Sequence, residues 1–539
     1  MSSFDLNEVV IIGAGLVGSL LAYLLQKRGY QVTIYERYQD IRTIPSLGRS
    51  INLVITRRGL RAVDSIGGGL REELLSLAVK VIGRTIHQSD GSIQFQRYGK
   101  DDNECNYSIS RYELNKFLIQ KSESAGAKIY FGHELDTNGT YFAEEGGDVG
   151  ATLKFKVTNN GVVSEKIVRC ECPVIGCDGG GSRARYAMRK DGLLEFTESL
   201  LGTENGGSPH SYKEILFPAD SGLVQHGLHI WPRRNHMLMA LANLDGSMTG
   251  TLYMDKDGEE SFATINDDET ATKFFEKYYP EVISLVGGIE KARSQMLNNP
   301  SGLLGTVRTT KWNYKGRIVL IGDAAHAIVP FFGQGMNCGF EDVLQLLIVL
   351  EKYRCKGGSI GTIKTIVNGE ETIESEGSLN QMSTEDAASW ATAFEEFNNA
   401  RKANGDAIAQ LAVENFHEMR DRVADRTFLL QKRVENRIEK AMSHKFRSGY
   451  AMVCYGGSGV GEVTYHNALE LSRVQNEILG SLIKDLAAEL EALPGDSDWS
   501  SHLDDYASRV SLEDAEKLID EKVVPLHEKY GIDLSTVAA

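Results

Sequence analysis

The chain contains 539 residues, of which 42% are hydrophobic and 24% charged, and its formal net charge at pH 7 is -16. This length exceeds what one compact core usually holds, so about two or three domains are expected, and so acidic a chain disfavours nucleic acid as a partner. The seven cysteines include no paired Cys-x-x-Cys motif, and no run approaches the roughly 20 apolar residues of a membrane span, which argues against a metal site and an integral membrane anchor.

The first elements in chain order predict a β-α-β unit. Residues Glu8–Ile12 form a short apolar run that is typical of a buried parallel strand. A glycine turn follows, and then an apolar helical pattern extends to Gln26. A second strand is expected over Gln31–Tyr35, which completes the unit.

Gly13, Gly15 and Gly18 form a G-x-G-x-x-G turn between this strand and helix. Such a turn lets a pyrophosphate approach the helix N-terminus, where free N–H groups and the helix dipole favour anions. Glu36 follows the second strand, and a carboxylate there accepts hydrogen bonds from a ribose and repels a 2′-phosphate. Glycines are common in turns, but here the strand, helix and acid all stand in the expected order. The pattern indicates NAD or FAD and argues against NADP at this site.

Strands dominate the middle of the chain, and helices its last part. Asn160-Gly161, between two alternating stretches, predicts a two-residue hairpin, and residues 225–255 contain runs typical of antiparallel strands. Arg317–Leu320 is a further buried strand. From about Phe340 the pattern is helical, apart from residues 356–387, which are rich in Gly, Ser, Thr and Glu and which we interpret as an exposed polar insertion.

Two more motifs follow strands, at Cys177-Asp178-Gly179 and at Gly322-Asp323, and the second leads into the run Gly333–Asn337. With the glycine turn they resemble the DG and GD motifs of the class A flavoprotein hydroxylases. In that family the GD aspartate binds the ribityl chain of FAD, and the Gly-rich helix start lies against the flavin. Gly322-Asp323 alone would be an ordinary strand-to-turn step, but three motifs in the family's order favour FAD. His326, in the same run, could serve as an acid or base, but we interpret it as a packing or flavin-adjacent residue.

Four segments narrow the resemblance to the kynurenine 3-monooxygenase family. They are GRSINL at 48–53, SRYELN at 110–115, LHIWPR at 228–233 and HAIVPFFGQGMN at 326–337. The similarity extends from about residue 8 to about residue 470 and fades in the insertion and in the C-terminal tail. It implies a fold of the α/β class, with an FAD-binding Rossmann-like domain of the glutathione-reductase type, a β-sheet substrate domain and a C-terminal helical region. The predicted FAD-binding domain comprises residues 1–80, 105–185 and 305–355, the substrate domain 81–104 and 186–304, and the helical region 356–539.

The resemblance implies a binding site for an amino-acid substrate. The family's carboxylate-binding arginine matches Arg84, which can form two charge-assisted hydrogen bonds to an α-carboxylate. From the sequence alone, an arginine near an aromatic residue is usually a surface residue with a packed stem, and an Asn-x-x-Glu pattern is usually a solvated helix face. The match of the second tyrosine, at position 450, depends mainly on spacing. The predicted substrate-binding residues are Arg84, Tyr98, Asn415 and Tyr450, with Phe332 and Glu418 supporting the pocket.

The implied activity is hydroxylation of L-kynurenine to 3-hydroxy-L-kynurenine through a C4a-hydroperoxyflavin, as a step of tryptophan degradation in the kynurenine pathway. The resemblance implies bound FAD, NADPH as a transient co-substrate without a Rossmann domain of its own, and O₂. Two alternatives remain: a flavin hydroxylase of another arylamine or phenol, and a non-catalytic flavin-binding regulatory protein. The predicted cofactor-binding residues are Gly13, Gly15, Val17, Gly18, Glu36, Arg37, Arg111, Asp178, Asp323, Gly335, Met336 and Asn337.

The C-terminal tail departs from the family's pattern. Eukaryotic members usually carry a C-terminal hydrophobic anchor for the mitochondrial outer membrane. Here Gly480–Leu493 has the pattern of an amphipathic helix that contains acids and a lysine. We therefore expect a soluble, cytoplasmic protein, although the resemblance leaves association with the mitochondrial outer membrane open.

Overall fold

The structure is a computed structural model, and it describes most of the chain. The described residues are 7–44, 51–99, 104–142, 150–159, 161–203, 206–356, 359–367, 370–375, 383–422, 425–494 and 499–537. Asn160 of the predicted hairpin turn and residues 48–50 of the GRSINL segment lie outside these ranges. Every predicted site residue lies inside them.

A six-stranded, mainly parallel sheet forms the centre of the N-terminal part. Strands β1 (Glu8–Ile12) and β2 (Gln31–Tyr35) pair in parallel and are joined by helix α1 (Leu16–Gln26), which confirms the predicted β-α-β unit. Their apolar side chains are almost fully buried, because a parallel sheet is covered on both faces. The strand order is β20 (Asn313–Tyr314), β21 (Ile318–Leu320), β12 (Val174–Gly176), β1, β2 and β8 (Lys128–Tyr130).

Two further sheets and several helices complete this part. Strands β10 and β11 form the predicted antiparallel hairpin on either side of Asn160-Gly161. The three-stranded sheet has the order β3 (Asn52–Ile55), β7 (Asn106–Ser110) and β4 (Ala78–Val81), and the five-stranded sheet has the order β23 (Glu370–Ser375), β22 (Ser359–Val367), β11 (Val162–Glu171), β10 (Ala151–Asn159) and β9 (His133–Leu135). The helices are α2 (Arg57–Asp64), α3 (Leu70–Leu75), α4 (Arg111–Ser124), α5 (Arg183–Lys190), α9 (Asp323–His326) and α10 (Gly335–Lys352).

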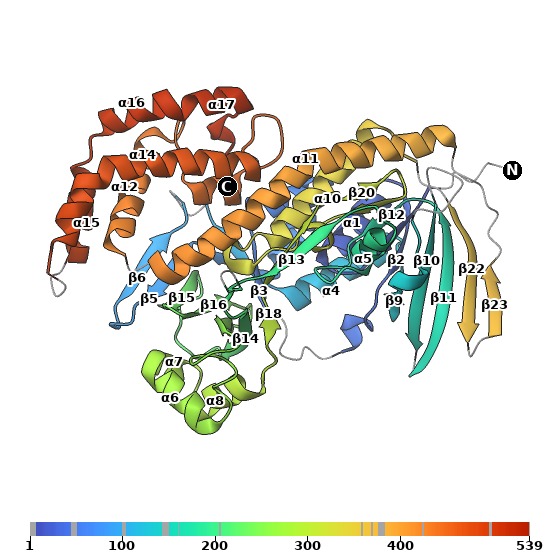
Figure 1. The fold of residues 1–539 in the computed structure, drawn as a ribbon, viewed down its shortest axis with the longest axis horizontal. Coiled ribbons are helices and arrows are strands. Elements are labelled where there is room, and N and C mark those ends of the chain that lie inside the picture. Colours follow the sequence, from blue (N-terminus) through green and yellow to red (C-terminus); the bar gives the residue numbers. More distant parts are fainter. Residues whose placement is uncertain are drawn as a thin grey trace.

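The polar stretch at 356–387 differs from our interpretation of it as an insertion into the helical region. Its described residues include β22, which pairs antiparallel with β11 and so extends the sheet of the N-terminal part (Figure 1). The Gly, Ser, Thr and Glu residues suggested an exposed insertion, but SIGTIKTIV is rich in isoleucine, valine and threonine, the β-branched residues that are enriched in strands. Strand β22 also pairs antiparallel with β23. We propose that this β22–β23 hairpin belongs to the FAD-binding domain, and we retain the other predicted domain boundaries as a proposal.

A seven-stranded sheet forms the middle of the molecule. Its order is β18 (Gly302–Leu303), β14 (His210–Phe217), β17 (Met248–Asp255), β16 (His236–Ala242), β15 (Gly227–Arg233), β5 (Gly83–His87) and β6 (Ile93–Arg97). One face packs on α6 (Asp268–Tyr278), α7 (Pro280–Leu285) and α8 (Ile289–Asn298), around the buried side chain of Trp231. The opposite face carries Leu228, Met239 and Tyr253, which pack toward the N-terminal part and line a cavity. A short two-stranded sheet of β13 (Phe196–Leu200) and β19 (Gly305–Thr309) links the two parts.

The C-terminal helices pack at the end of the molecule opposite the five-stranded sheet, and the long helix α11 crosses between the two ends (Figure 1). They are α11 (Thr384–His417), α12 (Arg426–Met442), α13 (Gly449–Tyr455), α14 (Tyr465–Glu491), α15 (Leu503–Ser508), α16 (Leu512–Lys522) and α17 (Val524–Tyr530). They bury a core of their own, to which Cys338 of α10 also contributes. The helical region predicted from the sequence is therefore present.

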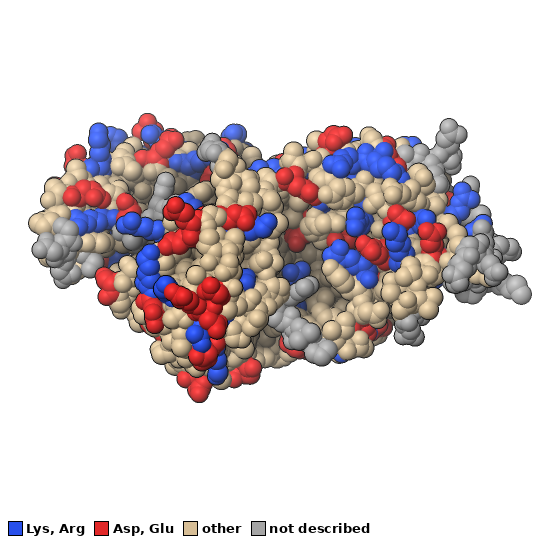
Figure 2. Space-filling view, turned by 60° about the horizontal axis from the view of Figure 1, so that its bottom comes forward, with Lys and Arg blue, Asp and Glu red and all other residues tan. Residues whose placement is uncertain are grey.

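Basic and acidic side chains both occur across the face seen in Figure 2, in small groups of either sign. Among the described helices, none combines the length and the apolar character needed to cross a membrane.

Candidate active site

A cavity lies between the N-terminal part, the seven-stranded sheet and the C-terminal helices. Among its lining residues we distinguish two groups by the segments that contribute them. The flavin end, as we name the first group, comprises Gly15, Leu16, Val17, Arg111, Cys177, Gly179, Asp323, Gly335 and Met336. The substrate end comprises Arg84, Tyr98, Leu228, Met239, Thr251, Tyr253, Phe331, Phe332, Met419 and Tyr450.

The glycine turn at the flavin end has a backbone that only glycine tolerates. Gly13 has a φ of +102°, and a Cβ built on it would lie 2.6 Å from the carbonyl oxygen of Cys177. Helix α1 starts immediately afterwards, with no acidic residue in its first turn and no side-chain cap at Gly15. Its free N–H groups therefore face the cavity, where an anion would be favoured.

Glu36 and Arg37, which follow β2, have different surroundings. The Glu36 carboxylate accepts hydrogen bonds from the backbone N–H groups of Ala14, at 2.7 Å, and Tyr38, at 2.9 Å. It therefore lies beside the glycine turn, as a ribose-binding acid must. Arg37 is exposed, and its guanidinium lies 4.4 Å from the ring centroid of Tyr38, away from the cavity lining.

The two motif aspartates also differ. Asp178 accepts hydrogen bonds from the Ser182 hydroxyl at 2.5 Å and the Ala184 N–H at 3.0 Å, so it caps helix α5. Burial raises the pKa of this carboxyl. Asp323 instead lines the cavity as the first residue of α9, after Gly322 with its φ of 58°. Asp323 is the aspartate that can reach a ligand in the cavity, whereas Asp178 shapes the turn around it.

The residues of the Gly-rich run Gly333–Asn337 also differ in whether they face the cavity. Gly335 and Met336 line the cavity at the start of α10, which has no side-chain cap. Asn337 is fully buried behind them: its amide donates to the carbonyls of Val54, at 2.7 Å, and Gly333, at 2.8 Å, while its oxygen accepts the Thr56 N–H at 2.9 Å. Asn337 therefore ties the turn to β3 and α2. Two uncapped helix starts and an aspartate around one cavity fit the pyrophosphate, ring edge and ribityl hydroxyls of FAD.

Three predicted residues meet at the substrate end. The guanidinium of Arg84, on β5, lies 5.0 Å from the ring centroid of Tyr450, on α13, and 5.8 Å from that of Tyr98. The two tyrosine rings stack at 4.9 Å. Burial alone would lower the pKa of Arg84, but the neighbouring Tyr98, Tyr450 and Glu418 raise it above its ordinary value. Within the described residues the buried Nε–H of Arg84 has no hydrogen-bond acceptor, and an anionic ligand would supply one.

Asn415 lies behind the cavity. It is buried near the end of α11, and its amide donates to the carbonyl of Phe331 at 2.8 Å, so it fixes the phenylalanine pair that lines the pocket. Phe332 stacks against Tyr450 with ring centroids 5.8 Å apart. Glu418 begins a π-helical turn (Glu418–Arg422), and its Oε2 lies 4.0 Å from Nζ of Lys432. Such turns often occur at functional sites because they redirect side chains, and here Met419 enters the cavity.

The seven-stranded sheet contributes cavity residues that were not predicted from the sequence. Met239, Thr251 and Tyr253 project from β16 and β17 into the cavity, and the ring of Tyr253 lies 4.9 Å from that of Phe331. The sequence runs MLMALANL and TGTLYMD predicted the strands, but they are apolar at successive positions, so only the strand pairing shows which residues share the cavity face. Arg84 and Tyr253 are three strands apart, or ~14 Å across the sheet.

His326 is buried, stacks on Trp312 with ring centroids 4.7 Å apart and hydrogen-bonds through Nε2 to Oδ2 of Asp342 at 2.6 Å. It is absent from the cavity lining. The geometry fits the packing interpretation that we gave it.

Comparison with known proteins places this site in a family. The FAD binding domain family matches residues 7–205 and 232–357. Kynurenine 3-monooxygenase of Flavobacterium psychrophilum is 36% identical over 483 residues, covering 89% of this chain and 94% of the relative. That of Xanthomonas oryzae pv. oryzae is 37% identical over 511 residues, covering 93% and 95%. The chain belongs to the kynurenine 3-monooxygenase family. This confirms the predicted resemblance and FAD as the cofactor.

Solved structures outside the kynurenine 3-monooxygenase family share its fold. The protein is similar to 2-methyl-3-hydroxypyridine-5-carboxylic acid oxygenase, with a TM-score of 0.54 and 15% identity over 77% of this chain and 93% of that one. It is also similar to CtdE in complex with FAD and substrate, with a TM-score of 0.56 and 15% identity over 78% and 91%. At this identity the likeness concerns the fold alone, and it confirms the predicted α/β class.

Proposed function

We propose that this protein hydroxylates L-kynurenine at the ring carbon next to the arylamine, forming 3-hydroxy-L-kynurenine. One observation carries the proposal: Arg84, Tyr98 and Tyr450 form a cationic, aromatic cluster in the cavity that the flavin-binding motifs also line. The curated relatives described above bear the name of this activity over most of their length. The overall reaction converts the substrate, NADPH, a proton and O₂ into the hydroxylated product, NADP⁺ and water.

The substrate end would hold the amino-acid part of the substrate. Arg84 can donate two parallel hydrogen bonds to the α-carboxylate. Burial raises the pKa of the Tyr98 hydroxyl, so this group stays protonated and can donate a further bond. The positive charge of Arg84 attracts an anion locally although the chain as a whole carries a charge of -16.

The rest of the cavity would hold and shield the aromatic ring. Leu228, Met239, Phe331 and Phe332 provide an apolar lining between Arg84 and the flavin end. Such a lining orients the ring and excludes water, which limits side reactions of reduced oxygen species. Bound FAD supplies the transfer of electrons from NADPH to O₂ and of one oxygen atom to the ring. The arylamine already activates the ring carbon beside it, so no protein side chain needs to act as a nucleophile.

The direct test measures NADPH oxidation by the purified, FAD-loaded protein with and without L-kynurenine, with the product mass determined in parallel. We expect strong stimulation and a product heavier by one oxygen atom. Stimulation with hydrogen peroxide but without hydroxylated product would make kynurenine only an effector. An unchanged rate would favour another arylamine or phenol, and a flavin that NADPH fails to reduce with any aromatic ligand would favour a binding protein.

A further inference from the structure

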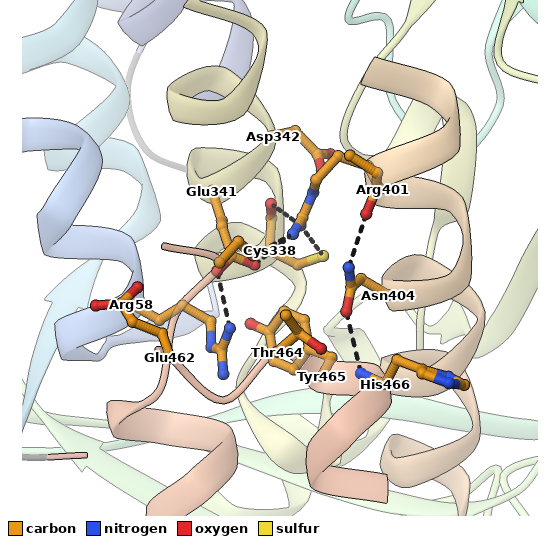
Figure 3. Close-up of polar contacts among 12 residues, drawn as sticks. Arg58, Cys338, Glu341, Asp342, Arg401, Asn404, Glu462, Thr464, Tyr465 and His466 are labelled. Carbon is orange, nitrogen blue, oxygen red and sulfur yellow. Dashed lines mark hydrogen bonds and ion pairs between the residues drawn. The ribbon is translucent and has the colours of Figure 1, made fainter. Parts of the chain in front are cut away.

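A buried group of four alternating charges joins the flavin end to the C-terminal helices. Arg58 on α2, Glu341 and Asp342 on α10, and Arg401 on α11 have exposed fractions of 0% to 2%. They form a chain of ion pairs: Arg58 to Glu341 at 2.8 Å, Glu341 to Arg401 at 2.6 Å, and Arg401 to Asp342 at 2.8 Å. We name these four residues the charge bridge, and Figure 3 shows how they face one another between the helices.

The charge bridge is electrically balanced, because it contains two guanidinium groups and two carboxylates. Removing a charged group from water costs several kcal/mol, so a buried ion pair is a poor means of adding stability. Such groups instead impose geometry, since each guanidinium has donors in fixed directions. The role of the charge bridge therefore depends on which segments it holds together.

One end of the charge bridge holds the turn at Gly322-Asp323, which we name the flavin turn. Asp342 accepts the backbone N–H of Gly322 at 2.9 Å, directly before the cavity residue Asp323. The same carboxylate accepts a hydrogen bond from Nε2 of His326 at 2.6 Å, so both ends of the α9 segment are tied to α10. The position of Asp323 therefore depends on Asp342.

The other end holds the segment that carries Tyr450. Arg58 donates from Nη2 to the carbonyls of Met452, at 3.0 Å, and Val463, at 2.9 Å, and from Nε to the carbonyl of Val453 at 2.9 Å. Met452 and Val453 belong to α13, the seven-residue helix whose second residue is Tyr450. The Met452 carbonyl also accepts the backbone N–H of Gly456 at 3.2 Å, and a cation beside the last carbonyls of a helix interacts favourably with them, so Arg58 anchors this end of α13.

A second contact links the C-terminal helices to the start of α10. Tyr465, at the start of α14, donates its hydroxyl to Oε1 of Gln334 at 2.8 Å, and Gln334 is the residue between Gly333 and Gly335. The guanidinium of Arg58 lies over the Tyr465 ring, 3.9 Å from its centroid. Arg58 thus contacts α13, the loop before α14 and, through Tyr465, Gln334 at the N-terminus of α10.

We propose that the charge bridge is a positioning device: Arg58 and Glu341 fix α13, and with it Tyr450, relative to the flavin turn held by Asp342 and Arg401. Its consequence rests on the proposed function, because Tyr450 lies against Arg84, where the substrate carboxylate would bind. Specificity for the amino-acid part of the substrate then depends on Arg58, which lies outside the cavity lining.

The test uses a charge-balanced variant, Arg58→Met/Glu341→Gln, which removes one positive and one negative charge and leaves Arg401 opposite Asp342. A milder variant, Arg58→Lys, keeps the charge but cannot reach three carbonyls and a carboxylate together. The matched control is Arg71→Gln, which breaks an exposed ion pair with Asp64 at the end of the same helix. All variants are purified as holoenzyme, and the FAD content is measured first.

Two readouts separate this proposal from the proposed function. Hydrogen exchange of the backbone amides of α13 needs no substrate, and we expect at least ~10-fold faster exchange there in the charge-balanced variant, with β1 unchanged. Binding of L-kynurenine without NADPH, followed by flavin fluorescence, is expected to weaken ~10-fold in that variant, less in Arg58→Lys, and not in Arg71→Gln.

A double-mutant cycle shows whether Arg58 acts through Tyr450. We expect Tyr450→Phe to weaken binding in the wild type and to have little further effect in the charge-balanced variant, because Tyr450 is already displaced. Additive effects, unchanged exchange in α13, or loss of FAD from both Arg58 variants would each overturn the positioning role. Failure of the wild type to bind L-kynurenine, with fast exchange in α13 of the variant, would contradict the proposed substrate and leave the positioning role supported.

Discussion

The two ends of the cavity are built in different ways. The flavin end is assembled from short local motifs at strand ends and helix starts, so the residues within each motif lie close in sequence although the motifs themselves lie far apart in the chain. The substrate end brings together Arg84 from β5, Tyr98 directly after the edge strand β6, and Tyr450 from a helix more than 300 residues later in the chain. Local backbone geometry therefore determines cofactor binding, whereas packing between distant segments determines the substrate site.

The largest expected effect is at the flavin end. Gly13→Ala places a methyl group 2.6 Å from the carbonyl of Cys177 on a backbone with a φ of +102°, so the turn cannot keep its shape. We expect purified protein without FAD and without activity, measured as flavin absorbance per mole of protein. The control is Gly29→Ala, at a φ of +87° with open space around the added Cβ, which should retain FAD. Full FAD content in Gly13→Ala would contradict the assigned turn.

A smaller effect is expected from Tyr98→Phe. This substitution changes only the substrate end, so it tests whether substrate binding can be weakened without loss of FAD. The variant keeps the ring that stacks on Tyr450 and loses one hydrogen bond to a charged ligand, so we expect the Kd for L-kynurenine to rise ~10-fold. FAD content should remain that of the wild type. An unchanged Kd would mean that the hydroxyl of Tyr98 does not reach the substrate.

The smallest effect concerns pH. Burial alone would raise the pKa of Asp342 and of Glu341, but His326 and Arg401 beside Asp342, and Arg401 and Arg58 beside Glu341, hold these values below the ordinary range. The folded protein then binds fewer protons than the unfolded chain, so this contribution is present above the unfolded pKa and is lost as pH falls below about 4.5. We expect Tm to fall with pH there, by about 1 °C per kcal/mol lost, because a chain of 539 residues has a large unfolding entropy. The slope should be shallower in Asp342→Asn, and an equal slope would contradict the assignment.

Much of the flavin end could be predicted from the sequence because glycine turns and strand-end acids are local signals. Even there, the sequence could not separate Asp178, which caps α5, from Asp323, which faces the cavity. Both follow buried strands, and only the direction of each carboxylate distinguishes them. Arg37 was predicted to bind the cofactor together with the residues that the family resemblance implies, and the structure places it on the surface.

The substrate end could not be derived from local patterns. Arg84 and Tyr450 came from the family resemblance, and no spacing rule connects a strand residue with a helix residue so far along the chain. Asn415 was expected to bind substrate, whereas its amide bonds the carbonyl of Phe331. The sheet residues Met239 and Tyr253 required the strand pairing, because both strands are apolar at successive positions and the sequence therefore does not show which face lines the cavity.

The central claim is that Arg84 holds the substrate carboxylate while the flavin end stays independent of it. The most direct measurement compares the binding of L-kynurenine and of its decarboxylated analogue to holoenzyme, in the wild type and in Arg84→Met. We predict that the wild type prefers L-kynurenine by ~100-fold, consistent with a desolvated, two-point ion pair, and that Arg84→Met keeps its FAD but loses this preference. An equal preference in both proteins, or loss of FAD from Arg84→Met, would contradict the account.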